Sequence, residues 1–426
     1  MYLELYTCLV FSIMELVHGR KGRASRCAPV EDVIGNMPEN VITNIMDRLP
    51  LQEAVRTAIL SRKWRYKWTL LSQLVFDYDF FQSLKRSGDA IMHFDQKNIS
   101  RLMLHLKGAI TNFVLDMPEG IALDVEDVNH WIIFLCRIGI KKFTLLNDYD
   151  ELKLPANIFS CIALQHLELH CCFFSPLPSF HGLPNLLSLE LYKVRVQDYK
   201  CGDIIAQSPL LEKLSIFDFV ARCEVKLVEI VKLANLRELC LSLLLLDNVT
   251  MTRPSNIFHQ LSLLPKLQNL ILYFWDCTFL AEVGEQTWVS TAFPCLKTLS
   301  LYGIDFSSDT MLSCVIGMLS DAPNLQTLDI TAAYKSTLPP PLISFLEVDC
   351  NTIGQLQLQN VVLASIKGLE NEVCLIKSIL ACSPLLKRIV ITPNILLMGD
   401  GNEKFKLASK LLKLHRASPL AEISFH

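Results

Sequence analysis

The sequence predicts an α/β fold in which an N-terminal helical block precedes a solenoid of parallel strands with outer helices, closed by a C-terminal cap. Two observations lead to this prediction. Apolar residues recur at helical spacing between residues 32 and 72, and one short apolar pattern repeats along most of the remaining chain. Of the 426 residues, 51% are hydrophobic and 19% are charged, a composition that can fill a large core and argues against global disorder.

Residues 1–31 precede this helical block, and we interpret them as an irregular extension. Residues 5–17 are apolar, but the cations of GRKGRASR follow that run, whereas a secretory signal carries its cations before it. The run is also shorter than the ~20 residues of a membrane-spanning helix, and Glu15 interrupts it. We therefore expect no membrane association and a location in the cytoplasm or nucleus. A membrane anchor is the alternative.

The helical block begins with one amphipathic helix. Pro38 suits its first turn and Pro50 ends it. Between them, apolar side chains recur at the spacing of one helix face: Val41, Ile42, Ile45, Met46 and Leu49. We predict that this face packs on the rest of the block.

A second helix is predicted after Pro50, and it contains the stretch SRKWRYKW, residues 61–68. Leu60, Trp64 and Trp68 are four residues apart, so a helix would align them on one face, beside a cationic stripe of Arg56, Lys63 and Lys67. A nucleic-acid site would instead need rings presented along an open groove. The spacing therefore favours packed tryptophans beside solvated cations over nucleic-acid binding.

Residues 32–72 resemble an F-box, the short helical motif that docks a protein onto the Skp adaptor of a cullin-based ubiquitin ligase. The matching residues are Asp32, Ile34, Met37, Pro38, Val41, Ile42, Ile45, Leu49, Pro50, Ala54, Val55, Thr57, Ile59, Leu60, Ser61, Trp64, Arg65 and Trp68. Departures are mild, with Met37 and Met46 at leucine positions and Ala58 at a serine position. The stretch LPLQEAVRTAILSRKWRYKW is especially similar to plant F-box proteins with leucine-rich repeats and a C-terminal FBD domain.

The resemblance implies that eight of these residues meet the adaptor or hold the F-box helices together. They are Pro38, Ile42, Ile45, Leu49, Pro50, Val55, Leu60 and Trp64. The sequence does not divide the two roles among them.

Residues 73–352 are predicted to form the solenoid. The pattern apolar-x-x-apolar-x-apolar begins at Leu164, Leu186, Leu211, Leu236, Leu267, Leu296, Leu325, Ile353 and Leu386, with weaker copies at Ile110 and Ile140. From Leu164 onward the spacing is 22 to 33 residues, mostly within or close to the ~20–29 residues of leucine-rich repeats. Each copy would contribute one short parallel strand.

Successive side chains of a strand point to opposite faces, which predicts the side chains on the concave face of the solenoid. In each copy they are the residue between the last two apolar positions and the residues directly before and after these two positions. They run from His166, Glu168 and His170 in the copy at Leu164 to Gln355, Gln357 and Gln359 in the copy at Ile353. Aromatic residues occupy one column of this face, and charged residues lie beside it. The predicted target-binding residues are Tyr192, Phe217, Tyr273, Tyr302, Glu190 and Lys213. The alternative is a ring stripe that only stabilises the sheet.

Residues 353–426 hold the last repeats and a segment similar to the FBD domain of plant F-box proteins, through CSPLLKRIVI and HRASPLAEISF. A helix, a turn and a strand are predicted in LENEVCLIKSILACSPLLKRIVITPN, then a helix in EKFKLASKLLKLHRAS and a strand in AEISF. We interpret this segment as a cap on the open end of the solenoid.

No catalytic residue, metal ligand or cofactor site is predicted. The chain lacks the motifs GxSxG, GxxxxGK and HExxH. Its fifteen cysteines include no CxxC, so we expect reduced, buried thiols and neither a zinc site nor a disulfide framework. His166 and His170 fall on one strand, about 13 Å apart, too far to share an ion.

The predicted function is that of a non-enzymatic substrate receptor in a Skp–cullin–F-box ubiquitin ligase. The F-box would bind the Skp adaptor and through it a cullin, and the repeats would hold a target protein close to the conjugating enzyme. A non-degradative binding scaffold with a degenerate or adaptor-only F-box is the first alternative. A nucleic-acid binder is the second, although the formal net charge of −3 argues against binding by the whole protein.

Overall fold

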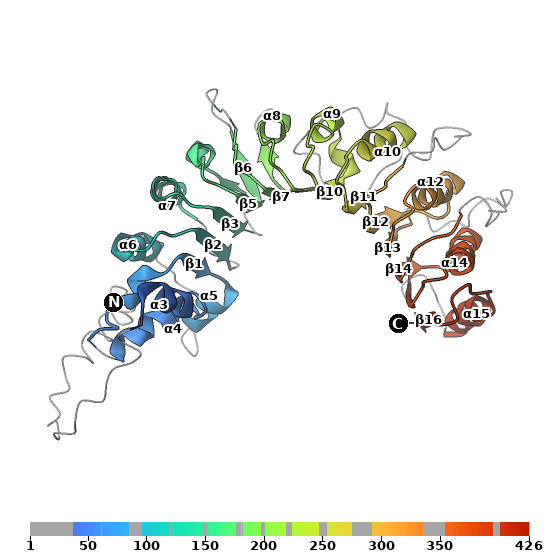
Figure 1. The fold of residues 1–426 in the computed structure, drawn as a ribbon, viewed down its shortest axis with the longest axis horizontal. Helices are drawn as coiled ribbons and strands as arrows, with labels where there is room; N and C mark the ends of the chain where they lie inside the picture. Colours follow the sequence, from blue (N-terminus) through green and yellow to red (C-terminus); the bar gives the residue numbers. More distant parts are fainter. Residues whose placement is uncertain are drawn as a thin grey trace, which may run out of the picture. The chain divides into compact units, whose positions relative to one another are not determined.

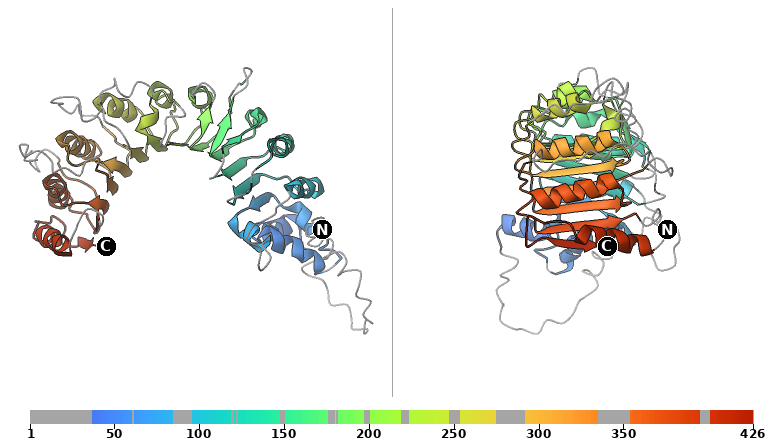
Figure 2. Two further views of the ribbon diagram at one scale, coloured as in Figure 1. Left: turned by 180° about the vertical axis from the view of Figure 1, so that it is seen from behind. Right: turned by 90° about the vertical axis from the view of Figure 1, so that its right-hand side faces the viewer.

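The computed structural model describes residues 37–60, 62–84, 96–118, 121, 123–147, 151–175, 180, 182–196, 201–218, 224–246, 254–274, 292–334, 354–394 and 401–425. The predicted extension, residues 1–31, lies outside the described residues. The chain divides into two compact units, Met1–Ser188 with Val194–Gln197 (unit 1) and Leu189–Lys193 with Asp198–His426 (unit 2). In each unit, parallel strands follow one another in chain order and helices cover one of their faces (Figures 1 and 2). We call the opposite face of the strands the open face.

Unit 1 begins with the predicted helical block. It contains α3 (Glu39–Met46), α4 (Leu51–Arg56), and the 3-10 helices η2 (Thr57–Ile59) and η3 (Lys67–Leu70). Pro38 and Pro50 precede α3 and α4 directly, each with extended backbone, as their fixed φ and missing N–H favour. Ile42 and Met46, one turn apart on α3, are fully buried.

The prediction of one continuous second helix is wrong. The helix ends at Arg56, and a 3-10 turn, several turns and η3 follow it. Part of the reason is local, because the Thr57 hydroxyl donates to the carbonyl oxygen of Ala54 at 2.6 Å and competes with helical geometry. Breaking the helix lets Trp64 and Trp68 both turn inward while Leu60 stays 66% exposed. The three side chains therefore do not share a face.

The strands of unit 1 begin directly after the block. β1 (Gln73–Phe76), β2 (Asn112–Met117), β3 (Lys142–Asn147) and β5 (His166–His170) pair in parallel, in that order. The helices of unit 1 are α5 (Tyr78–Leu84), α6 (Lys97–His105), α7 (Val125–Ile138) and η4 (Ala156–Ser160). Short strands β4 (Leu152–Lys153), β6 (Cys172–Phe174) and β8 (Arg195–Val196) form a second sheet that the sequence did not predict.

A ladder of buried rings runs through this core. Phe113 and Phe143 are register partners on β2 and β3, with ring centroids 5.5 Å apart. Phe76 lies on β1, two residues beyond the register partner of Phe113, and its ring centroid is 5.9 Å from that of Phe113. β1 was not predicted as a repeat, although Leu71, Leu74 and Phe76 match the apolar pattern. The weaker copies at Ile110 and Ile140 are confirmed as β2 and β3.

The described residues of unit 2 continue the pattern over nine strands in chain order. They are β7 (Ser188–Tyr192, in unit 2 from Leu189), β9 (Lys213–Phe217), β10 (Glu238–Ser242), β11 (Asn269–Tyr273), β12 (Thr298–Ile304), β13 (Thr327–Ala332), β14 (Asn360–Ile366), β15 (Arg388–Pro393) and β16 (Glu422–Phe425). The helices are α8 (Gly202–Ala206), α9 (Leu227–Ile230), η6 (Leu243–Leu245), α10 (Pro254–Ser262), α12 (Asp309–Ser320), α14 (Glu370–Cys382) and α15 (Gly401–Leu412).

The predicted register is wrong in one copy. Gln355, Gln357 and Gln359 precede the strand, which begins at Asn360 and pairs Asn360 with Thr327. Leu358, Val361 and Leu363 match the apolar pattern as well as Ile353, Leu356 and Leu358 do. Only the strand pairing distinguishes these overlapping matches, which differ by five residues.

The C-terminal elements agree with the prediction, since α14, β15, α15 and β16 follow in the expected order. β16 pairs in parallel with β15, so the segment that resembles an FBD domain extends the repeat sheet. The domain boundaries at residues 72 and 352, and the role of this segment as a cap, remain predictions.

The expectation of reduced cysteines is wrong at three positions. Cys136, in the last turn of α7, is disulfide-bonded to Cys161, just after η4, with 4.8 Å between their Cα atoms. Cys201 is disulfide-bonded too. The spacing of the cysteines could not reveal the first pair, because the packing of α7 on η4 brings it together. Seven described cysteines are thiols outside any disulfide: Cys171, Cys172, Cys240, Cys295, Cys314, Cys374 and Cys382.

Candidate functional site: the helical block and the open face

The structure divides the eight predicted adaptor-binding residues into two groups. Ile42, Val55 and Trp64 are buried, so they hold the helical block together. The other five reach the surface: Pro38, Ile45, Pro50 and Leu60 are exposed, and Leu49 is half-buried. These five are the ones that a partner could contact.

Two further apolar side chains are exposed beside these five. Val41 is 40% exposed on α3, one turn from Ile45, and Ile59 is 53% exposed beside Leu60. Both were part of the F-box resemblance but not of the predicted contact set. Since an isolated domain gains nothing from presenting large apolar side chains in clusters, such clusters indicate a protein interface. On α3, the described structure buries Ile42 and Met46 but leaves the neighbouring apolar side chains of Val41 and Ile45 exposed.

The tryptophans of SRKWRYKW are unavailable for base stacking. Trp64 and Trp68 are 5% and 7% exposed. The Lys67 ammonium lies 4.0 Å from the Glu39 carboxylate, and Arg56 pairs with Glu53 at 2.5 Å. Burial of both indole rings leaves Tyr66, 56% exposed, as the one accessible ring of this stretch, whereas the nucleic-acid hypothesis requires several rings along a groove.

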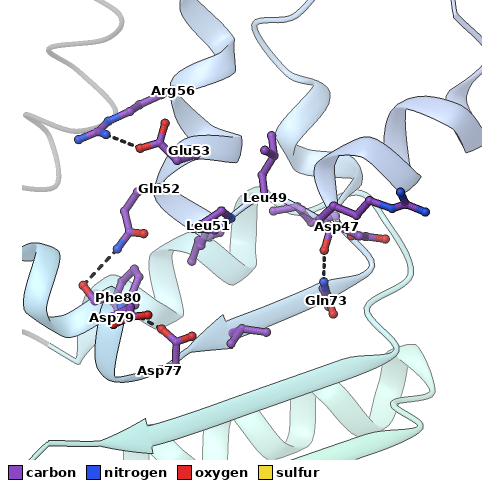
Figure 3. Close-up of a pocket in the computed structure, with 14 residues that line it drawn as sticks. Asp47, Leu49, Leu51, Gln52, Glu53, Arg56, Gln73, Asp77, Asp79 and Phe80 are labelled. Atoms are coloured by element: carbon purple, nitrogen blue, oxygen red, sulfur yellow. Dashed lines mark hydrogen bonds and ion pairs between the residues drawn. The ribbon is translucent and has the colours of Figure 1, made fainter.

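A cleft of about 460 Å³ lies between the helical block and the first repeat of unit 1 (Figure 3). Hydrogen bonds cross its floor and walls. The Ser72 amide and hydroxyl donate to the Asp47 carboxylate at 2.9 and 2.5 Å, and the Gln73 side chain donates to the Asp47 carbonyl oxygen. On α4, Gln52 donates to the Phe80 carbonyl oxygen at 3.1 Å. These bonds tie α3 and α4 to β1 and α5.

The open face carries the predicted target-binding residues. All six face the side opposite the helices and are half-buried: Tyr192, Phe217, Tyr273, Tyr302, Glu190 and Lys213. Glu190 and Lys213, on β7 and β9, form an ion pair at 2.7 Å. The structure therefore brings this pair together at one end of the aromatic column.

The four rings form one continuous column in unit 2. Ring centroids are 5.9 Å apart for Tyr192 and Phe217, 4.4 Å for Phe217 and Tyr273, and 4.8 Å for Tyr273 and Tyr302. Small side chains beneath the larger ones are buried, against the prediction of a fully solvated face. Examples are Ser215, Cys240, Ser242 and Ser300. The rings thus stabilise one another and still present an edge or face to solvent.

Asp329 adjoins this column and was not among the predicted site residues. The Tyr302 hydroxyl donates to its carboxylate at 3.1 Å, from the neighbouring strand. Burial raises the pKa of Asp329, and burial together with the Asp329 charge raises the pKa of Tyr302. The sequence does contain a signal for Asp329, since it is an acid predicted on the open face in the repeat that follows the one with Tyr302.

In unit 1 the open face carries a separate charged cluster. Glu168 lies 3.6 Å from His170 on β5, and this contact is the main reason that the pKa of Glu168 is lowered. Within the described ranges, no group of three or more His, Cys, Asp or Glu side chains could hold a metal ion. None of the helices described there is long and apolar enough to cross a bilayer.

Comparison with known proteins finds family matches for the helical block and for part of the repeats. The F-box domain model matches residues 34–75, and a model of the leucine-rich repeats of FBD-associated F-box protein At5g56370 matches residues 128–251. The chain is 28% identical to the Arabidopsis thaliana F-box/FBD/LRR-repeat protein At1g13570, over 92% of this chain and 98% of that protein. It is 30% identical to F-box/FBD/LRR-repeat protein At2g04230 of the same plant, over 39% of this chain and 38% of that protein.

Among solved structures, an internalin (inlF) from Listeria monocytogenes is 12% identical, covers 82% of this chain and 90% of that chain, and has a TM-score of 0.35. A leucine-rich-repeat protein from Leptospira interrogans, LIC12759, is 16% identical, covers 85% of this chain and 62% of that chain, and has a TM-score of 0.31. These TM-scores are low, and the fold of this chain is established by its own parallel strands and repeats.

Proposed function

We propose that this chain, which belongs to the plant F-box/FBD/leucine-rich-repeat proteins, is the substrate-recognition subunit of a Skp–cullin–F-box ubiquitin ligase. Its F-box is followed by parallel-stranded leucine-rich repeats in an α/β fold. In this proposal the F-box binds the Skp adaptor, the adaptor binds a cullin, and the open face of the repeats binds a target protein. A location in the cytoplasm or nucleus is part of the proposal.

One observation supports the proposed binding of the F-box to the Skp adaptor. Within the segment that matches the F-box model, buried side chains complete a small core while Ile45, Ile59 and Leu60 remain exposed. A helical block this small gains stability by burying apolar side chains, so exposed ones are best explained by a partner that covers them.

The mechanism requires no catalytic group in this chain. Binding of the target and the adaptor by one protein makes the encounter between target lysines and the conjugating enzyme intramolecular, which raises their effective concentration. The hydrogen bonds that join α3 and α4 to β1 and α5 help to hold the F-box and the first repeat in a fixed arrangement within unit 1.

Calorimetric titration of the purified chain with a recombinant plant Skp adaptor tests whether the F-box binds this adaptor. We expect stoichiometric binding that Leu60→Asp weakens by about 30-fold or more, the equivalent of ~2 kcal/mol for an interface hot spot. Leu210→Asp is the matched control, since Leu210 is also an exposed leucine but lies in unit 2. Equal binding by Leu60→Asp, Ile45→Asp and the unaltered chain would refute the assignment.

The competing proposal is a binding scaffold that promotes no degradation. A reconstituted complex of the chain, adaptor, cullin and conjugating enzyme distinguishes the two once a target is in hand. Ubiquitin transfer to the bound target, lost with Leu60→Asp, supports the ligase subunit. A stable complex with target and adaptor but without transfer supports the scaffold.

A further inference from the structure

We propose that the open face of unit 2 recognises an extended target segment through an arginine or lysine side chain, held between the ring of Tyr302 and the carboxylate of Asp329. The inference deepens the proposed function, because it names the chemistry of the target and rests on target binding by the repeats.

The aromatic column ends abruptly at Tyr302. Tyr302 pairs with Thr331 on β13, Thr331 with Ala364 on β14, and Ala364 with Thr392 on β15. One face of the Tyr302 ring is stacked on Tyr273, with 18° between the ring planes. The opposite face is therefore directed over small side chains, where a flat or slender group has room to lie against it.

Asp329 lies next to Tyr302, on the side away from Tyr273, where no described ring stacks on Tyr302. It is on β13, two residues before Thr331 and on the same side of the strand. The Tyr302 hydroxyl occupies one of its lone pairs, and a carboxylate can accept about four hydrogen bonds in total. The remaining acceptor sites are available to a ligand.

The carboxylate of Asp329 has no cationic partner among the described residues. No ion pair there involves it, and its pKa is raised by burial, whereas a nearby cation would lower it. The ammonium of Lys367 is engaged at 3.9 Å over the ring of Tyr334. Tyr334 is five residues beyond Asp329, about 16 Å along an extended chain.

An aromatic face beside an unpaired carboxylate matches the chemistry of a cationic side chain. A guanidinium or ammonium group is attracted to the ring face and donates charge-assisted hydrogen bonds to the carboxylate. Arginine suits both contacts best, since its planar group stacks on the ring and its fork of donors reaches a carboxylate.

The rest of the column determines the length of the segment. From Tyr192 on β7 to Tyr302 on β12 there are four strand spacings, or about 19 Å. An extended peptide of about six residues covers that distance. We infer a segment whose cation meets Asp329 and whose neighbouring apolar side chains lie on Tyr273, Phe217 and Tyr192.

Selection from a random twelve-residue peptide display library on the full-length chain tests the inference. Peptides selected by the unaltered chain are expected to be enriched in arginine or lysine, and Asp329→Asn is expected to abolish that enrichment. Glu238→Gln, which neutralises another acid at the open face, is the control that should retain it. Absence of selected peptides, absence of cation enrichment, or enrichment that survives in Asp329→Asn would each overturn the proposal.

Affinity measurements on one selected peptide separate the two contacts. Asp329→Asn and Tyr302→Leu should each weaken binding by about tenfold, and replacing the peptide cation by norleucine should weaken binding to the unaltered chain to the same extent. Tyr302→Phe keeps the ring and should retain most of the affinity. All variants should still bind the Skp adaptor like the unaltered chain, so failure of peptide recognition is distinguishable from failure of the ligase proposal.

Discussion

The rings of Phe217 and Tyr273 meet at 4.4 Å between centroids, although β10 lies between the strands that carry them. Two strand spacings separate their backbones by about 9–10 Å, so the rings lean toward each other. They can do so because Ser242 occupies the equivalent position on β10 and is 1% exposed, beneath them. A small residue in the middle of the column thus makes the column continuous.

Ser242→Leu should therefore separate the two rings. We expect a loss of about 1–3 kcal/mol in the free energy of unfolding, the usual cost of adding methylenes to a filled site. Ser242→Ala is the matched control. The Ser242 hydroxyl is buried without a hydrogen-bond partner in the described structure, so removing it should leave stability unchanged or raise it by up to about 1 kcal/mol. Urea unfolding of the three proteins provides the comparison, and equal midpoints for Ser242→Leu and Ser242→Ala would contradict this view of the column.

Trp64 and Leu60 should respond oppositely to substitution, despite their common membership of the F-box match. Trp64→Ala removes a buried ring and should cost about 3–5 kcal/mol of stability. Leu60→Asp alters a side chain that is 66% exposed and should change stability by no more than about 0.5 kcal/mol while it weakens adaptor binding. Thermal unfolding beside the titration separates the two effects. Comparable destabilisation by both substitutions would mean that Leu60 belongs to the core.

Strand positions were predictable because the repeat pattern has the two-residue period of a half-buried strand. Its copies predicted the register of five neighbouring strands of unit 2 correctly. The first residues of these strands pair from one strand to the next: Lys213, Glu238, Asn269, Thr298 and Thr327. The prediction went wrong at Leu358, which satisfies two overlapping copies of the pattern. Pairing with a neighbouring strand decides between such copies, and that contact is not encoded locally.

The roles within the candidate sites were less predictable than the strands. Trp64 and Leu60 have the spacing of one helix face, yet one is buried and the other exposed because the helix ends at Arg56. Asp329 acquires its place beside Tyr302 from the pairing of β12 with β13. In both cases tertiary packing, and not the local period, determines what a side chain can contact.

The disulfide between Cys136 and Cys161 should contribute to the stability of unit 1. It closes a loop with a sequence separation of 25 residues, for which restriction of the unfolded chain is worth about 3.5 kcal/mol. Cys136→Ser and Cys161→Ser should each lower the free energy of unfolding by about that amount. Cys295→Ser, at an exposed free thiol, is the control and should have little effect. A reducing agent should destabilise the unaltered chain more than either variant of the pair, because the variants retain, among the described cysteines, only the disulfide of Cys201. Equal effects of reduction on the unaltered chain and on the variants would contradict the prediction.

Glu372 should make stability depend on pH. Its buried carboxylate accepts hydrogen bonds from the amides of Gly368 and Leu369 at 2.6 and 2.7 Å, at the start of α14. Burial nevertheless dominates and raises its pKa from 4.5 to about 7. Between these values the folded chain binds more protons than the unfolded chain at this position. The contribution of Glu372 is therefore fully present below about pH 4.5 and is lost as pH rises through about 7.

Glu372→Gln isolates this contribution, because it retains the size of the side chain and removes the titration. Urea unfolding of both proteins at pH 5, 6 and 8 gives the difference in stability at each pH. The unaltered chain should lose stability relative to Glu372→Gln as pH increases across this range, and other titrating groups cancel in the comparison. A difference that stays constant with pH would show that the amide hydrogen bonds of Gly368 and Leu369 keep the carboxylate ionised throughout, and that burial does not control its protonation.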